Sequence, residues 1–154
     1  MNTHRLLLLP GFLAAFLYLG DTPTLAAQQY DGPVLADVVS VYDGDTLTVD
    51  AHPWPQITMR VSVRVNGIDT PEIRGKCETE KALAQEAKAL TKQMSDQKVV
   101  LKNIFLGKYA GRVVADVYAE DGTKIAEALI SLGLAYRYEG GTRRSWCSAI
   151  VDPS

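Results

Sequence analysis

The chain has 154 residues, of which 47% are hydrophobic and 22% are charged, and its formal net charge is −2. This composition is typical of one globular domain and argues against a disordered chain. The negative net charge argues against a protein held on long duplex DNA mainly by a basic surface, although it leaves room for a few arginines focused on one phosphate.

Residues 1–27 have the pattern of a secretory signal peptide. Arg5 is the one cation before an apolar run at residues 6–19, and small side chains follow at Ala26 and Ala27. We therefore predict cleavage near Ala27, export to the periplasm or the medium without stable membrane association, and one domain over residues 28–154. The alternative is an N-terminal membrane anchor, but the run is shorter than the ~20 residues that a membrane span needs.

Three strands are expected next. Residues 34–42 are rich in β-formers and end at the turn sequence Asp-Gly-Asp, and residues 46–49 form a second short strand. From Ile57 to Val65, aliphatic side chains at odd positions alternate strictly with Thr, Arg and Ser at even positions. This period is typical of a half-buried antiparallel strand, so we expect the aliphatic side chains on the core face and Arg64 on the opposite face.

The period then changes to that of a helix. Over residues 79–96, apolar side chains recur at helical spacing, as Leu83, Ala87, Leu90 and Met94. Residues 98–106 and 112–118 are expected as a fourth and a fifth strand, and residues 124–132 as a short amphipathic helix. This order favours an α+β fold, a five-stranded OB-fold barrel with two helices packed on it and a short C-terminal tail, over a parallel α/β sheet.

Few residues are available for histidine or cysteine chemistry. Only His52 remains once residues 1–27 are removed, so a Ser-His or Cys-His pair is poorly supported and a structural zinc site cannot find its ligands. In an oxidising compartment, Cys77 and Cys147 are expected either to form one disulfide or to remain as two free buried thiols.

Acidic residues and arginines occur in three short segments. They are Asp-Gly-Asp-Thr at residues 43–46, Arg64 with Asp-Thr-Pro-Glu at residues 69–72, and Gly-Arg at residues 111–112. Each alone is typical of a turn, a loop end or a surface arginine. Their occurrence together, in this order and on this strand pattern, is far more specific and resembles the staphylococcal nuclease (thermonuclease) family over about residues 34–138.

The resemblance implies a set of roles. By it, Asp45 and Asp69 are Ca²⁺ ligands with the backbone carbonyl of Thr70, Glu72 is the general base, and Arg64 and Arg112 are the catalytic arginines. It also implies Ca²⁺-dependent, sequence-nonspecific hydrolysis of DNA and RNA that leaves 3′-phosphates, and we expect a monomer. The chemistry is consistent, because Ca²⁺ prefers oxygen ligands and arginine offers a planar fork to phosphate oxygens.

Further residues resemble the family's nucleotide contacts. They are Lys108, Tyr109, Tyr136 and Tyr138. Two residues separate Tyr109 from Arg112 where the family has one, and the alternative for Tyr136 and Tyr138 is a strand edge packed on the core.

The end of the chain departs from the family. Where the family has a long final helix, this chain has residues 139–154, which contain Trp146 and Cys147. We predict that Trp146 packs down and that Cys147 forms a disulfide with Cys77, which replaces the helix as a clasp.

Two other function classes remain open. One is a catalytically silent OB-fold module that binds nucleic acid or protein. The other is a small structural domain in which a calcium ion only stabilises the fold.

Overall fold

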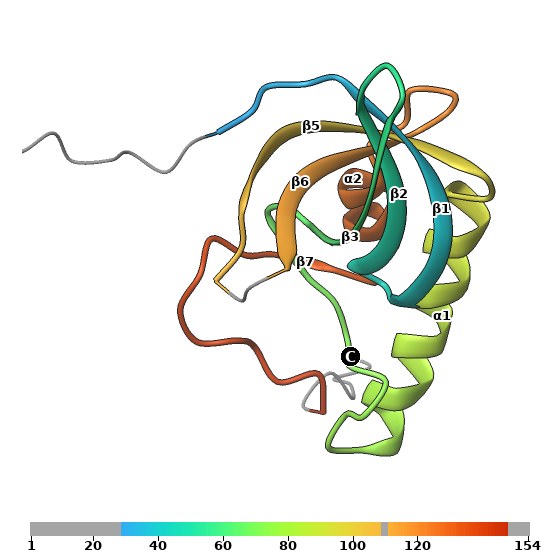
Figure 1. Cartoon of the computed structure of the whole chain (residues 1–154). Coiled ribbons are helices and arrows are strands. Elements are labelled where there is room, and N and C mark those ends of the chain that lie inside the picture. The colour runs from blue at the N-terminus through green and yellow to red at the C-terminus, as the bar shows by residue number, and fades with distance from the viewer. Residues whose placement is uncertain (1–28, 109–110, 148–154) are drawn as a thin grey trace, which may run out of the picture.

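Five strands close into a barrel in the computed structural model, which describes residues 29–108 and 111–147 (Figure 1). They are β1 (Val34–Asp43), β2 (Thr46–Trp54), β3 (Ile57–Val65), β5 (Lys98–Leu106) and β6 (Arg112–Ala119), in the order β1-β2-β3-β6-β5. The helices are α1 (Glu78–Met94) and α2 (Ile125–Ser131), and β4 (Ile68–Asp69) pairs with β7 (Tyr136–Arg137) outside the barrel. The predicted five-stranded barrel with two helices is confirmed. None of the described helices is both long and apolar enough to span a membrane.

The barrel is mixed, because β3 and β6 run parallel while the other neighbouring strands are antiparallel. The β2–β3 pairing sets Thr46 opposite Arg64, and the β3–β6 pairing sets Ser62 opposite Arg112. Strand register therefore brings the end of the turn at residues 43–46 and two arginine-bearing strands to the same end of the barrel.

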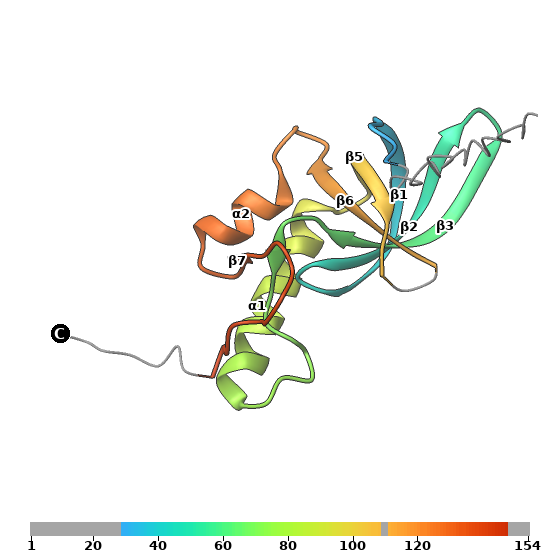
Figure 2. The same ribbon diagram turned by 90° about the vertical axis from the view of Figure 1, so that its left-hand side faces the viewer.

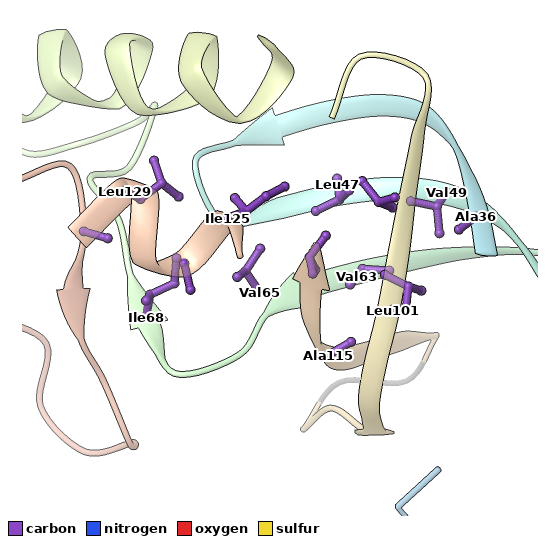
Figure 3. Close-up of a cluster of buried hydrophobic side chains, with 14 of the residues drawn as sticks. Ala36, Leu47, Val49, Val63, Val65, Ile68, Leu101, Ala115, Ile125 and Leu129 are labelled. Atoms are coloured by element: carbon purple, nitrogen blue, oxygen red, sulfur yellow. The ribbon is translucent and has the colours of Figure 1, made fainter. Parts of the chain in front are cut away.

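Aliphatic side chains from the strands and from α2 fill the barrel (Figure 3). Strand alternation turns every second residue inward, which buries Leu47 and Val49 on β2 and Val63 and Val65 on β3. Helix α2 closes one end of the core with fully buried side chains, among them Leu129. The packed core therefore fixes the strand ends that carry the turn at residues 43–46 and the two arginines.

One part of the core prediction is wrong. Ile57 and Met59 continue the aliphatic alternation of β3, but their exposed fractions are 48% and 56%. Strand β6 pairs with β3 only from Ser62 to Val65, and β2 and β3 extend past the barrel as a two-stranded hairpin (Figure 2). Among residues 29–108 and 111–147, no further strand or helix covers the outer half of the hairpin, so Ile57 and Met59 are exposed there.

The tail after β7 is fixed at both ends. The backbone N–H of Tyr138 donates to the carbonyl of Gly67 at 2.9 Å, and Cys147 forms a disulfide with Cys77, which is the N-cap residue of α1. Between them, Trp146 is 3% exposed and stacks on Tyr136 with ring centroids 4.1 Å apart. The predicted disulfide and the predicted packing of Trp146 are both present.

The core predicts the effect of truncating a buried leucine. Leu47→Ala removes a side chain that is 0% exposed and should lower the free energy of unfolding by about 2–5 kcal/mol, because it leaves a cavity. Urea denaturation followed by circular dichroism measures this loss. Leu35→Ala, at a position 62% exposed on β1, is the control and should cost less than about 0.5 kcal/mol. Equal losses in the two variants would contradict this description of the core.

Candidate active site

Two buried carboxylates lie at one end of the barrel and share one arginine. Asp45 ends the turn between β1 and β2, Asp69 lies in β4, and the two residues are only 1% and 2% exposed. The guanidinium of Arg64 lies 2.9 Å from Asp45 Oδ1 through Nη1 and 3.4 Å from Asp69 Oδ1 through Nη2. A buried charge needs a partner, so Arg64 holds the two acidic loops together.

Helix α1 positions the turn that carries Asp45. The hydroxyl of Thr91, which is fully buried, donates to the carbonyl of Gly44 at 2.7 Å. A Cβ at Gly44 would lie 2.7 Å from Ala87 Cβ and 2.9 Å from Thr70 Cγ2, so only glycine allows this close approach. Sequence reasoning placed Ala87 on the inner face of a helix but missed the role of Thr91.

Thr70 joins the two loops through its backbone. Its N–H donates to Asp45 Oδ2 at 3.3 Å, and its carbonyl accepts from Arg143 Nη2 at 3.1 Å. Thr70 is 1% exposed, so its carbonyl lies beside the buried carboxylates as a further oxygen.

Burial disfavours the charged forms of two carboxyl groups in this cluster, Asp45 and Asp43. Burial raises the pKa of Asp45 to about 7; the charge of Arg64 opposes this rise, and the carboxylate of Asp43 adds to it. The pKa of Asp43 is also raised, by burial first and then by the charge of Glu72. Asp69 Oδ2 is buried and has no hydrogen-bond partner among the described residues. These properties favour binding of an additional cation.

The donor atoms fit a hard cation such as Ca²⁺ or Mg²⁺. Asp45, Asp69 and the carbonyl of Thr70 supply oxygens, and the orphaned Oδ2 of Asp69 is ready to accept a positive partner. In the described part of the chain, the one trio of ligand-type side chains within 4.8 Å of one another is Cys77, Glu80 and Cys147. Its two sulfur atoms are bonded to each other, so it is not a metal site. The other ligands at the Asp45–Asp69 pair would be water or substrate oxygens.

A cavity of about 450 Å³ opens beside the acidic cluster. Half of its lining residues are cationic, and the full lining consists of Arg64, Glu72, Gly107, Lys108, Arg112, Val114, Tyr138 and Arg143. The N–H of Gly107 donates to the carbonyl of Arg112 at 2.9 Å, which fixes the strand ends that carry Lys108 and Arg112. The structure therefore brings Arg64, Arg112, Glu72, Lys108 and Tyr138 of the predicted set to one cavity.

One predicted substrate contact, Tyr136, does not line this cavity in the described part of the chain. Tyr136 is half-buried, stacks on Trp146 and has the guanidinium of Arg144 over its ring at 5.2 Å. Tyr109 lies outside the described residues.

The structure adds one residue that sequence reasoning missed. Arg143, in the tail, lies 2.6 Å from Asp69 Oδ1 through Nη2 and forms an ion pair with Glu72 through Nη1. The contact joins positions about seventy residues apart in the sequence. The only signal was the Arg-Arg pair shortly before Cys147.

Comparison with known proteins gives one match. Residues 62–147 match the family model described as staphylococcal nuclease homologue, which is more than half of the chain. The matched region runs from β3 to the disulfide and includes Arg64, Asp69, Glu72 and Arg112, while Asp45 lies before it. Comparison with curated proteins gives no match.

The raised pKa of Asp45 predicts how stability depends on pH. A carboxyl that titrates at 3.8 when unfolded and near 7 when folded stabilises the fold fully below pH 3.8, and that contribution is lost as the pH rises through 7. In the presence of a chelator, the native chain should therefore lose more unfolding free energy between pH 4 and pH 7 than Asp45→Asn does.

Urea denaturation at several pH values measures this difference. Asp96→Asn, which changes an exposed carboxylate after α1, should keep the pH dependence of the native chain. A native-like slope in Asp45→Asn would show that the site does not titrate in this way.

Proposed function

The chain belongs to the staphylococcal nuclease homologue family, and from this we propose that it is a Ca²⁺-dependent, sequence-nonspecific nuclease that hydrolyses DNA and RNA and leaves 3′-phosphates. One observation carries the proposal: Arg64, Arg112 and Glu72 line a single cavity beside the buried Asp45–Asp69 pair. Cationic donors, a proton acceptor and an oxygen-rich cation site together can catalyse phosphodiester hydrolysis.

Arg64 and Arg112 are the proposed phosphate-binding residues. They come from the neighbouring parallel strands β3 and β6 and line the same cavity. Each guanidinium presents parallel N–H donors that match the oxygens of a phosphate, where negative charge builds in the transition state. Arg64 also pairs with both Asp45 and Asp69, so it links the two parts of the site.

Glu72 is the proposed proton acceptor. Its carboxylate lines the cavity and its side chain is 39% exposed, so water can reach it. A carboxylate in this place can accept a proton from the water that attacks the phosphorus, provided that Arg143 releases it.

The proposed ligands of Ca²⁺ are Asp45, Asp69 and the carbonyl of Thr70. A bound divalent cation would neutralise charge on the scissile phosphate and polarise one of its oxygens. Two observations support this assignment: burial raises the pKa of Asp45 despite the nearby Arg64, and Asp69 Oδ2 is buried without a hydrogen-bond partner among the described residues.

The nucleotide itself is proposed to contact Lys108, Tyr109 and Tyr138. Lys108 and Tyr138 line the cavity next to the arginines. Tyr136 was expected to stack on a base as well, but its contacts with Trp146 and Arg144 favour packing over base stacking at this position.

We also propose that the protein is exported and acts as a monomer. The Cys77–Cys147 disulfide is typical of an oxidising compartment. It agrees with a signal peptide over residues 1–27 and a nuclease domain over residues 28–154 in the periplasm or outside the cell.

Cleavage assays with matched variants test the function. Purified protein should degrade plasmid DNA and RNA with millimolar Ca²⁺ and leave both intact with EGTA. Arg112→Ala should lower the rate about 10²–10³-fold, because it removes a donor from the developing charge. Glu72→Gln should lower it about 10²–10⁴-fold by removing the proton acceptor. Gel electrophoresis and the release of acid-soluble nucleotides give the rates.

Arg60→Ala is the control on the same strand as Arg64. Arg60 pairs with Asp50 on the exposed hairpin, so this variant should cleave at the rate of the native chain. Intact substrate at all Ca²⁺ concentrations would contradict the proposal. Nucleic-acid binding without cleavage would instead support the catalytically silent module.

A further inference from the structure

The tail places a positive charge on the oxygens that are proposed to hold the cation. Arg143 Nη2 lies 2.6 Å from Asp69 Oδ1 and 3.1 Å from the carbonyl oxygen of Thr70, and Nη1 forms an ion pair with Glu72 Oε1. The three acceptors belong to one short segment at residues 69–72, and one of them, Glu72, is the proposed proton acceptor. One guanidinium thus bridges two parts of the proposed machinery.

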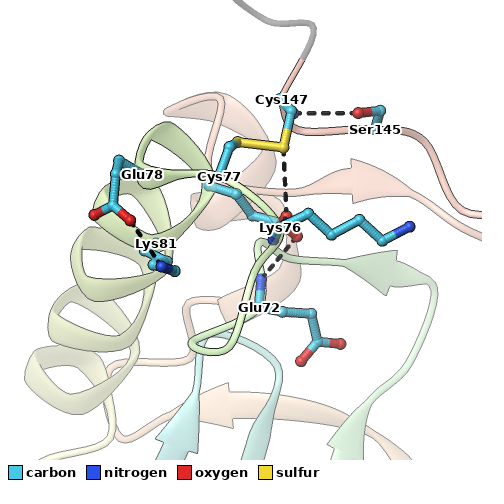
Figure 4. Close-up of a disulfide and its surroundings, with 8 residues drawn as sticks. Glu72, Lys76, Cys77, Glu78, Lys81, Ser145 and Cys147 are labelled. Carbon is cyan, nitrogen blue, oxygen red and sulfur yellow. Dashed lines mark hydrogen bonds and ion pairs between the residues drawn. A yellow bond between two sulfur atoms is a disulfide. The ribbon is translucent and has the colours of Figure 1, made fainter.

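A covalent bond joins the same two segments as this ion pair. Cys77 follows Glu72 by five residues, Cys147 follows Arg143 by four, and the two cysteines form the disulfide (Figure 4). Trp146, directly before Cys147, is buried against Tyr136 and fixes the tail from another side.

Helix α1 holds the other side of the disulfide. Glu80 accepts from the backbone N–H of Lys76 at 2.9 Å and from that of Glu72 at 3.4 Å. The segment from Glu72 to Cys77 is therefore attached to α1, and the tail is attached to that segment.

This arrangement sets up a competition. A divalent cation would bind the orphaned Asp69 Oδ2 and the carbonyl of Thr70, while the guanidinium of Arg143 holds Asp69 Oδ1 and the same carbonyl. The two positive charges would therefore share one carboxylate and one carbonyl and repel each other at short range. The disulfide increases the effective concentration of Arg143 at these oxygens, because its own segment is tied beside them.

We propose that Arg143 is a built-in competitor of the cation, held at the site by the Cys77–Cys147 disulfide. The inference rests on the proposed function, because it concerns the cation site of the proposed nuclease. Ca²⁺ binds more tightly when Arg143 leaves Asp69 and Thr70, so the tail raises the Ca²⁺ concentration at which the site fills. Loss of the disulfide weakens the competitor and lowers that concentration.

Calorimetric titration of the protein with Ca²⁺, without substrate, tests the competition. Arg143→Gln should bind Ca²⁺ at least about tenfold more tightly than the native chain, because it removes the charge-assisted contact with Asp69 that opposes the cation. Arg144→Gln is the matched control, because Arg144 is the next residue and its guanidinium lies over the Tyr136 ring. It should change the affinity less than about twofold, within the tenths of a kcal/mol typical of exposed charges.

The disulfide is tested by the same titration in two backgrounds. The double variant Cys77→Ser/Cys147→Ser should bind Ca²⁺ more tightly than the native chain. Adding Arg143→Gln to this double variant should give a Ca²⁺ affinity no higher than that of Arg143→Gln alone, because the disulfide acts on the site through Arg143. Thermal melting first establishes that each variant is folded. If the double variant is unfolded, the comparison of Arg143→Gln with Arg144→Gln decides whether Arg143 competes with Ca²⁺.

The outcomes separate this inference from the proposed function. Equal or weaker Ca²⁺ binding by Arg143→Gln would overturn the competition, while cleavage in Ca²⁺ by the native chain would still support the nuclease. Absence of Ca²⁺ binding in every variant would overturn both the inference and the proposed cation dependence.

Discussion

The candidate site depends on one interaction, the pairing of Arg64 with two buried carboxylates. Asp45 and Asp69 come from different loops and are almost completely removed from water. Two like charges in such a place repel each other unless a cation lies between them. The register of β2 with β3 sets Arg64 opposite Thr46, so strand pairing places the guanidinium of Arg64 between the two carboxylates. Asp69 pairs in addition with a second positive group, the guanidinium of Arg143.

The tail connects this electrostatic requirement to the covalent structure. Arg143 adds a positive charge to Asp69 and Glu72, and the disulfide four residues later anchors its segment beside α1. The short segment after β7 makes two contacts: Trp146 packs against Tyr136 of β7, and Arg143 reaches the acidic cluster. The structural clasp and the electrostatic control of the site are therefore parts of one element.

Local patterns in the sequence predicted most of the fold, and long-range contacts account for what they missed. Alternation identified β3 and its inner face, but it cannot tell how far a hairpin extends past a barrel, so Ile57 and Met59 were assigned to the core incorrectly. The resemblance to the family, which rests on short recognisable segments, pointed to the residues around the cavity. Arg143 was missed because nothing near it in the sequence indicates the distant carboxylate that it contacts.

The number of Ca²⁺ ions bound per chain tests most directly whether Asp45 and Asp69 form one cation site. Equilibrium dialysis with labelled Ca²⁺ should give one ion per native chain. At the same free Ca²⁺ concentration, Asp69→Asn should bind almost none, because it removes the carboxylate with the orphaned oxygen. An unchanged stoichiometry and affinity in Asp69→Asn would contradict the account, since the ion would then bind elsewhere.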